Sequence, residues 1–388
     1  MGEFFVKCDK LFEIIDSLNE EYLKFMIDVC NIESPTDYKD GVDNVGKYFS
    51  LKAAEKGWLV EKQIQEISGD CICITMNPDA KEAPICFSGH MDTVHPIGSF
   101  GETPVSFDDE KMYGPGVVDC KGGIVASFMA MDALEKCGFN KRPVKLILQS
   151  DEENGSRNSN KTTVKYMYEK SKGCVAFLNT EPYTKGGLVI TRKGISKYKF
   201  EITGKSAHSC RCDTGVSAIC EAAQKIIRLE QYKDRNSITC NCGIISGGVA
   251  ENTVPEKCVF TADFRFNNED ERKEVEKIAN EIANTSFVEG TSCVLSLASF
   301  RCAMYETKEN LLLFQKIKKI YKENDIEDVD LIYSFGASDT ADLTQMGITC
   351  LDGFGTEGGK LHSLDEFIYT KSLSESAKRL ASVAYCIE

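Results

Sequence analysis

The strongest constraint on the fold is the alternation of short apolar runs with longer segments of helical periodicity in the first half of the chain. Apolar residues recur at helical spacing over residues 9–31, 41–56 and 119–137. Apolar runs of strand length occur at residues 58–66, 71–76, 85–88 and 144–149. The last of these is largely apolar without alternation, as expected for a strand buried on both faces. This pattern predicts an α/β fold with a mostly parallel sheet flanked by helices.

The pattern of predicted strands and helices changes near residue 190. Residues 197–203 alternate like a half-buried strand, and signals for a helix, two strands, a helix and a strand follow. These later elements are expected at residues 216–229, 238–245, 257–266, 270–283 and 293–298. The order β-α-β-β-α-β is typical of a ferredoxin-like α+β unit. We therefore predict a discontinuous main domain, residues 1–190 and 301–388, with a domain inserted at residues 191–300.

Charge and composition narrow the class of protein. The 388 residues include 46 basic and 60 acidic side chains, which gives a net charge of −14. Such a surface repels phosphate backbones and anionic lipid, so we expect neither a nucleic-acid nor a membrane partner. No secretory signal or membrane-spanning run is found, which predicts a cytoplasmic protein with reduced thiols. The spacing of the 18 cysteines does not fit a zinc ribbon, and we interpret them as small buried apolar residues.

A first candidate motif follows the strand predicted at residues 85–88. His90 and Asp92 are two residues apart, so they share a face if the chain there is extended. An aspartate in that position can fix the tautomer and orientation of a metal-binding histidine. An isolated His-x-Asp is more often structural, so the motif alone leaves both interpretations open.

Carboxylates occupy two further element ends. Asp119 begins a predicted helix after Gly114-Pro-Gly116, where a dinucleotide-binding loop would need a third glycine instead. A plain helix cap is the alternative. Glu152 and Glu153 belong to an acidic triplet after the strand at residues 144–149, which is unfavourable unless a cation or proton compensates. A solvated acidic loop is the alternative there.

Taken together and in order, five segments resemble the dinuclear-zinc family of aminoacylases and metallo-carboxypeptidases. The segments are Gly89–Val94, Gly114–Gly123, Gln149–Ser156, Asn179–Pro182 and Lys360–Glu366. The family includes acetylornithine deacetylase, succinyl-diaminopimelate desuccinylase and bacterial glutamate carboxypeptidase, and the resemblance covers almost the whole chain. It implies a zinc-peptidase-like main domain that holds two zinc ions per subunit, although cobalt or manganese suits the same ligands.

The resemblance also implies individual roles. His90, Asp119 and Glu181 would bind one metal, and Asp119, Glu153 and His362 the other. Glu152 would be the general base, Asp92 would orient His90, and the Asp119–Cys120 peptide would be cis. The chemistry of these residue types agrees with the implied roles. Imidazoles and carboxylates suit zinc, and a carboxylate that binds no metal can transfer a proton. We expect Cys120 to fill space in the packing and not to bind metal, and we assign no role to His95.

The inserted domain is similar to the lid and dimerisation domain of that family. The resemblance implies that His208 serves the site of the partner subunit of a homodimer and stabilises a developing oxyanion. A proline common in that loop is absent here, which weakens the match. The resemblance further implies that substrate is bound by Asn252, Arg265, Gly336 and Ser338. Arg265 would read a substrate carboxylate, because a guanidinium pairs with it in bidentate fashion.

We therefore predict a two-metal hydrolase that cleaves an amide bond in a small peptide or N-acyl amino acid with a free carboxylate. The stretch Gly155–Ser159 favours the glutamate carboxypeptidase branch slightly. An N-acyl amino acid deacylase of the acetylornithine type is the alternative within the enzymes. A catalytically inactive relative that binds amino acids is the alternative from another class, and the intact Glu152 argues against it.

Overall fold

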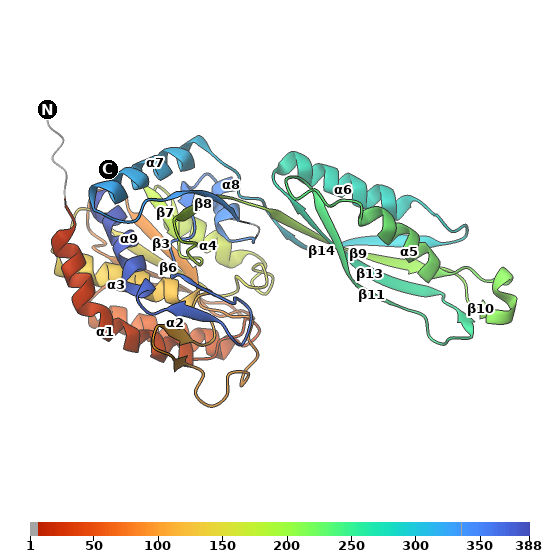
Figure 1. Ribbon diagram of the computed structural model, residues 1–388, viewed down its shortest axis with the longest axis horizontal. Helices are drawn as coiled ribbons and strands as arrows, with labels where there is room; N and C mark the ends of the chain where they lie inside the picture. The colour runs from red at the N-terminus through yellow and green to blue at the C-terminus, as the bar shows by residue number, and fades with distance from the viewer. Residues whose placement is uncertain (1–6, 335) are drawn as a thin grey trace. The chain divides into compact units, whose positions relative to one another are not determined.

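The computed structural model describes residues 7–334 and 336–388. The chain forms two compact units (Figure 1). The first unit comprises Met1–Ile190, Glu306–Tyr333 and Ser338–Glu388, and the second comprises Thr191–Tyr305 and Ser334–Ala337. Residues 1–6 and 335, which belong to the main domain expected from the sequence, lie outside the described residues. Among the residues described, no helix combines the length and hydropathy needed to cross a bilayer.

A six-stranded sheet forms the centre of the first unit, in the order β1-β2-β6-β3-β7-β16. Its strands are β1 (Leu59–Gln63), β2 (Cys71–Met76), β3 (Ile85–His90), β6 (Val144–Gln149), β7 (Ala176–Asn179) and β16 (Cys350–Leu351). The pairs β6/β3, β3/β7 and β7/β16 are parallel, whereas β1/β2 and β2/β6 are antiparallel. The α/β class is confirmed, and the sheet is mixed with a parallel half that carries the site.

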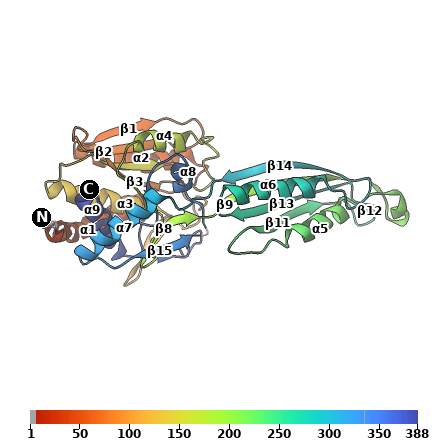
Figure 2. The ribbon, with the colours of Figure 1, turned by 90° about the horizontal axis from the view of Figure 1, so that it is seen from above.

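Helices surround this sheet (Figure 2). They are α1 (Asp9–Asn31), α2 (Lys39–Glu55), α3 (Lys121–Lys136), α4 (Thr162–Ser171), α7 (Lys308–Glu323), α8 (Thr340–Gln345) and α9 (Ser372–Cys386). The helix α3 contacts α1, α9 and β3, and most of its residues are buried. Its start requires glycine, because a Cβ on Gly123 would lie 2.2 Å from the carbonyl oxygen of Thr180. The beginning of α3 is therefore fixed against the end of β7.

Short strands form two smaller sheets beside the main one. The sheet β17-β18-β5-β4 is antiparallel, and β15 pairs with β8. Their bounds are β4 (Ser106–Phe107), β5 (Lys111–Tyr113), β8 (Gly187–Arg192), β15 (Asp330–Ser334), β17 (Gly358–Gly359) and β18 (Phe367–Tyr369). The loop between β17 and β18 contains His362.

The second unit is an antiparallel sheet in the order β11-β13-β9-β14, with two helices. Its elements are β9 (Gly194–Thr203), α5 (Ala218–Leu229), β11 (Thr239–Gly247), β13 (Lys257–Phe266), α6 (Glu269–Asn284) and β14 (Ser292–Arg301). A short pair, β10 (Ala207–His208) with β12 (Thr253–Val254), adjoins a 3-10 helix at Ser209–Thr214. Stacked rings of Phe200 and Phe260, 4.6 Å apart, lie in its core. The predicted ferredoxin-like order is confirmed.

Candidate metal centre

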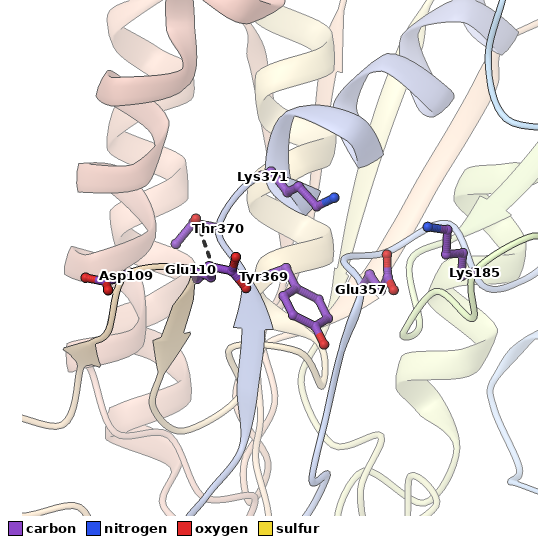
Figure 3. Close-up of a pocket in the computed structure, with 7 residues that line it drawn as sticks. All are labelled: Asp109, Glu110, Lys185, Glu357, Tyr369, Thr370 and Lys371. Carbon is purple, nitrogen blue, oxygen red and sulfur yellow. Dashed lines mark hydrogen bonds between the residues drawn. The ribbon is translucent and has the colours of Figure 1, made fainter.

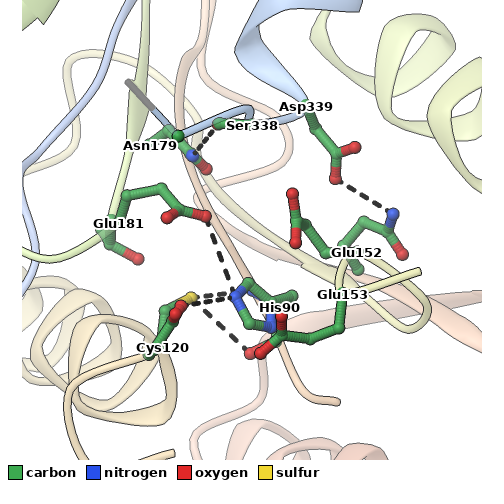
Figure 4. Close-up of polar contacts among 12 residues, drawn as sticks. His90, Cys120, Glu152, Glu153, Asn179, Glu181, Ser338 and Asp339 are labelled. Carbon is green, nitrogen blue, oxygen red and sulfur yellow. Dashed lines mark hydrogen bonds and ion pairs between the residues drawn. The ribbon is translucent and has the colours of Figure 1, made fainter. Parts of the chain in front are cut away.

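The site is built at the carboxyl ends of three neighbouring parallel strands. His90 ends β3 opposite Gln149, which ends β6, and Ser88 of β3 lies opposite Asn179, which ends β7. The residues that follow these strand ends therefore meet at one edge of the sheet, where open α/β sheets bind ligands. Figure 4 shows Glu181 and Glu153 directed at His90 from different sides.

The carboxylate of Asp119 lies between two histidines. Its Oδ1 is 3.0 Å from His90 Nε2, and its Oδ2 is 3.2 Å from His362 Nε2. Glu181 Oε1 is 3.8 Å from His90 Nε2, and Glu153 Oε2 is 3.3 Å from His362 Nε2. Each histidine thus faces Asp119 and one glutamate, and a ligand atom of Glu153 also lies within 4.8 Å of His90.

The donor set fits metal ions. Ligand atoms of His90, Asp119 and Glu153 lie within 4.8 Å of one another, as do those of His90, Glu152 and Glu181. Imidazole nitrogens and carboxylate oxygens are ligands that zinc and related divalent ions accept. Asp119 and Glu181 are less than a tenth exposed, and buried carboxylates without compensating cations are unfavourable. The residues present therefore fit a dinuclear centre.

The electrostatics of these side chains show the same need for cations. Burial, together with the charges of Asp119 and Glu152, raises the pKa of Glu153 to about 7. Hydrogen bonds with Asp119 and Glu153 raise the pKa of His362 to about 10, against the opposing effect of burial. Burial would raise the pKa of Asp119, but hydrogen bonds with His362 and His90 lower it below its usual range. Protons thus supply part of the positive charge that this cluster requires.

Asp92 organises the site through its carboxylate. Its Oδ1 accepts a hydrogen bond from the Glu152 N–H at 3.1 Å, and its Oδ2 accepts from the Glu153 N–H at 3.1 Å and from Thr36 Oγ1 at 2.8 Å. His90 Nδ1 lies 2.9 Å from the Asp92 carbonyl oxygen and 3.4 Å from Oδ1. The fully buried Asp92 therefore holds both the histidine and the loop that carries the two glutamates.

The three acidic residues after β6 differ in their surroundings: Asp151 stabilises the loop, and Glu152 and Glu153 face the site. Asp151 is fully buried and accepts hydrogen bonds from the Ser159 N–H at 2.8 Å and from Thr163 Oγ1 at 2.9 Å. These bonds close the loop that follows β6. Glu152 and Glu153 belong instead to the two groups of convergent ligand atoms.

The structure also gives the backbone conformation and hydrogen bonds of the other residues predicted for the site. His362 has a positive φ of 60°, a conformation that is uncommon outside glycine and clusters at functional sites. The Asp119–Cys120 peptide is cis, and Cys120 Sγ accepts a hydrogen bond from the His90 N–H at 3.0 Å.

Ser338 is buried and hydrogen-bonded to Asn179 Nδ2 at 3.1 Å, which supports the end of β7. Gly336 accepts a hydrogen bond from Arg192 within the second unit.

The remaining predicted residues lie in the second unit, near opposite ends of β13. His208 pairs with Thr253, and the Asn252 carbonyl accepts a hydrogen bond from the Ser209 N–H at 2.9 Å. This cluster adjoins the start of β13, whereas Arg265 is close to its end. The Arg265 guanidinium is bound in bidentate fashion by Asp263, at 2.7 and 3.1 Å. Its fork is thus already paired with a carboxylate of the same strand.

The sequence interpretation missed two residues beside the centre. His95 Nε2 lies 2.8 Å from Glu366 Oε2, and Glu366 contacts the backbone at Asp119. Glu366 belongs to the segment Lys360–Glu366 that the sequence had marked, but the spacing of 271 residues to His95 gives no sequence signal for their contact.

A separate pocket of the first unit shares no lining residue with these ligands (Figure 3). It is lined by Asp109, Glu110, Lys185, Glu357, Tyr369, Thr370 and Lys371. Two lysines there offset two of the three carboxylates, and the lining has no histidine. We assign this pocket no role.

Comparison with known proteins agrees with the geometry. Residues 86–385 match peptidase family M20/M25/M40. Carboxypeptidase G2 of Pseudomonas sp. (strain RS-16) is 27% identical over 67% of this chain and 63% of its own length. Succinyl-diaminopimelate desuccinylase of Rickettsia felis is 26% identical over 66% of this chain and 73% of its own length. Aminopeptidase PepT of Bacillus cereus has a similar fold, with a TM-score of 0.77 at 20% identity over 94% of this chain and 97% of that one.

Proposed function

This chain belongs to peptidase family M20/M25/M40, and from that premise we propose that it is a metal-dependent hydrolase of the glutamate carboxypeptidase type. Its substrate would be a small peptide or N-acyl amino acid with a free carboxylate. The observation that carries the proposal is the Asp119 carboxylate, whose two oxygens face His90 at 3.0 Å and His362 at 3.2 Å. The similarity to carboxypeptidase G2 spans less than two thirds of that enzyme, so the activity is a proposal for this chain.

Two divalent ions, which we propose to be zinc, would occupy the centre. His90, Asp119 and Glu181 would hold one, and Asp119, Glu153 and His362 the other. Cobalt or manganese would suit the same ligands. When bound, such ions polarise the scissile carbonyl and lower the pKa of a water molecule. Asp92 would keep the ligands in place through its bonds to the backbone at Glu152 and Glu153.

Glu152 would be the general base. It is 8% exposed, and the Asp92 carboxylate fixes its backbone N–H. A carboxylate held beside the ligands but not needed to complete either set can take a proton from water and pass it to the leaving amine. A catalytically inactive amino-acid-binding relative would have no use for such a residue.

The second unit would complete the site in a homodimer. Arg265 is eight positions along β13 from Lys257, at the start of the strand, which corresponds to about 26 Å at 3.3 Å per residue. A small substrate cannot reach both Arg265 and the cluster of His208 and Asn252 on one chain. This separation supports the proposal that His208 and Asn252 serve the site of the partner subunit. Arg265 would bind the substrate carboxylate in exchange for Asp263, and Gly336 and Ser338 would line the site.

We further propose a cytoplasmic location without a nucleic-acid or membrane partner. All 18 cysteines are described, and none of them forms a disulfide, which is typical of a reducing compartment. The net charge of −14 disfavours polyanionic partners.

Hydrolysis of a substrate panel by the zinc-loaded protein tests the function. The panel contains dipeptides with C-terminal glutamate, N-acetyl and N-succinyl amino acids, and the C-terminal amide of each, with Glu152→Gln as the control. The proposal predicts turnover of the free-acid dipeptides that the control lacks. Preferential turnover of the N-acyl amino acids would favour the deacylase alternative, which the similarity to the desuccinylase supports. Binding without any turnover would indicate the inactive relative.

A further inference from the structure

We propose that Glu366 is a positioning residue that fastens the loop carrying His362 to the segment carrying Asp119, and thereby sets the affinity of the second metal position. This inference rests on the proposed dinuclear centre. It assigns a role to a residue that is neither a metal ligand nor the proposed base.

The contacts of Glu366 span both segments. Its Oε1 accepts hydrogen bonds from the backbone N–H of Val118 at 3.0 Å and of Asp119 at 3.1 Å. Its Oε2 lies 2.8 Å from His95 Nε2, and its carbonyl oxygen accepts from the Gly114 N–H at 3.3 Å. Glu366 is 1% exposed and His95 is 6% exposed. The carboxylate therefore joins three parts of the chain in a place that excludes water.

The segment before Asp119 needs such a support. It leaves the sheet at Tyr113, and the following residues up to Asp119 form no helix or strand. Gly114 and Gly116 have φ values of 157° and 71°, a region that glycine tolerates best. Backbone this permissive does not by itself hold a carboxylate between two histidines, whereas two hydrogen bonds to Glu366 fix the last peptide before the bridging side chain.

The position of Glu366 links this support to the other ligand. Glu366 directly precedes β18 and follows His362 by four residues on the same loop. Movement of the loop away from Asp119 would break its hydrogen bonds at Val118 and Asp119. The proposed second metal position is bound by Asp119, Glu153 and His362. A looser connection between the His362 loop and the Asp119 segment should therefore weaken metal binding at this position before it weakens binding at the first position.

The role makes opposite predictions for two conservative variants. Glutamine keeps the length of the side chain, so its Oε1 can accept both backbone hydrogen bonds while its amide donates to a neutral His95. Aspartate keeps the charge but is one methylene shorter, so it cannot reach both partners. A positioning role therefore predicts that Glu366→Gln resembles the wild type and that Glu366→Asp and Glu366→Ala do not. If only the charge of Glu366 mattered, Glu366→Asp would resemble the wild type and Glu366→Gln would not.

The test measures metal binding as well as activity. Wild type, the three Glu366 variants and Asp132→Asn are titrated with zinc against a chelator, and the absorption spectrum of the cobalt-loaded forms is recorded. Asp132 is a matched control, since it is fully buried and pairs with Lys56 at 2.7 Å but contacts neither ligand segment. Thermal unfolding of each protein separates weaker metal binding from lower stability.

We expect Glu366→Ala and Glu366→Asp to bind one of two zinc ions about 10- to 100-fold more weakly, the range for residues that support metal ligands, with an altered cobalt spectrum. Glu366→Gln should stay within about threefold of the wild type. Asp132→Asn should lower the melting temperature and leave both affinities unchanged. Where Glu366→Ala does not fold, the contrast between the Asp and Gln variants decides.

Three results would overturn the inference. They are unchanged metal affinities in Glu366→Asp, a loss in Glu366→Gln but not in Glu366→Asp, and a wild type that binds fewer than two metal ions. A wild type that binds two ions but hydrolyses no substrate would instead overturn the proposed function, and the metal affinities would still test the role of Glu366.

Discussion

Replacing Asp92 with asparagine should disable the site without removing any proposed ligand. The carboxylate accepts hydrogen bonds from the N–H groups of Glu152 and Glu153 on its two different oxygens. An asparagine amide must therefore face at least one of these donors. Loss of one hydrogen bond to a charged group costs about 1.5–3 kcal/mol. At 1.4 kcal/mol per factor of ten, kcat/KM should fall roughly 10- to 150-fold.

Steady-state kinetics and a zinc titration against a chelator measure this effect. Metal affinity should fall by about 10- to 100-fold, because Asp92 also orients His90. Thr36→Val is the matched control, since it removes only the neutral donor to the same carboxylate at 2.8 Å. It should cost about 1 kcal/mol or less. Wild-type kcat/KM and metal affinity in a folded Asp92→Asn protein would refute the role given to Asp92.

Three further predictions concern the base, the dimer and the pH dependence. Glu152→Gln should keep its metal and lose about 10²–10⁴-fold in kcat, whereas loss of metal would mean that Glu152 is a ligand. Mixing inactive Glu152→Gln and His208→Ala proteins should restore part of the activity after subunit exchange, and confirmed exchange without activity would contradict the partner-subunit role of His208. The pKa values raised to about 7 for Glu153 and about 10 for His362 mean that both hold protons at pH 6 in the metal-free protein. The stability that these protons contribute is lost as the pH rises through those values, and metal must displace them, so affinity should rise with pH. Because the pKa of the buried His90 is raised as well, the metal must also displace its proton. Calorimetry in two buffers should therefore find about one proton more released at pH 6 than at pH 8, and an equal number at both would contradict this.

The parts of the fold that the sequence predicted are those with long periodic signals. The helix predicted at residues 9–31 and the strand predicted at residues 144–149 have the same bounds in the structure. Their side chains bury one face or both faces, so the pattern records the packing directly. The strands β17 and β18 have only two and three residues and show no period, although they flank the loop of His362.

The proposed ligands could be predicted because each follows an element end and the family motifs surround it. The supporting contacts could not. Glu366 meets His95 across 271 residues, and Asp92 meets the Glu153 N–H across 61, and both contacts depend on the strand order of the folded sheet. The pairing of Asp263 with Arg265 could have been anticipated, because residues two apart share a face on the strand predicted at residues 257–266.

Anomalous diffraction from crystals of the zinc-loaded protein, recorded on both sides of the zinc edge, tests the central claim most directly. We predict two zinc peaks about 3.5–4 Å apart, one on each side of the Asp119 carboxylate. The peak on the side of Oδ1 should be bound by His90, and the peak on the side of Oδ2 by His362. A single peak, or peaks from which Asp119 is remote, would contradict the dinuclear centre.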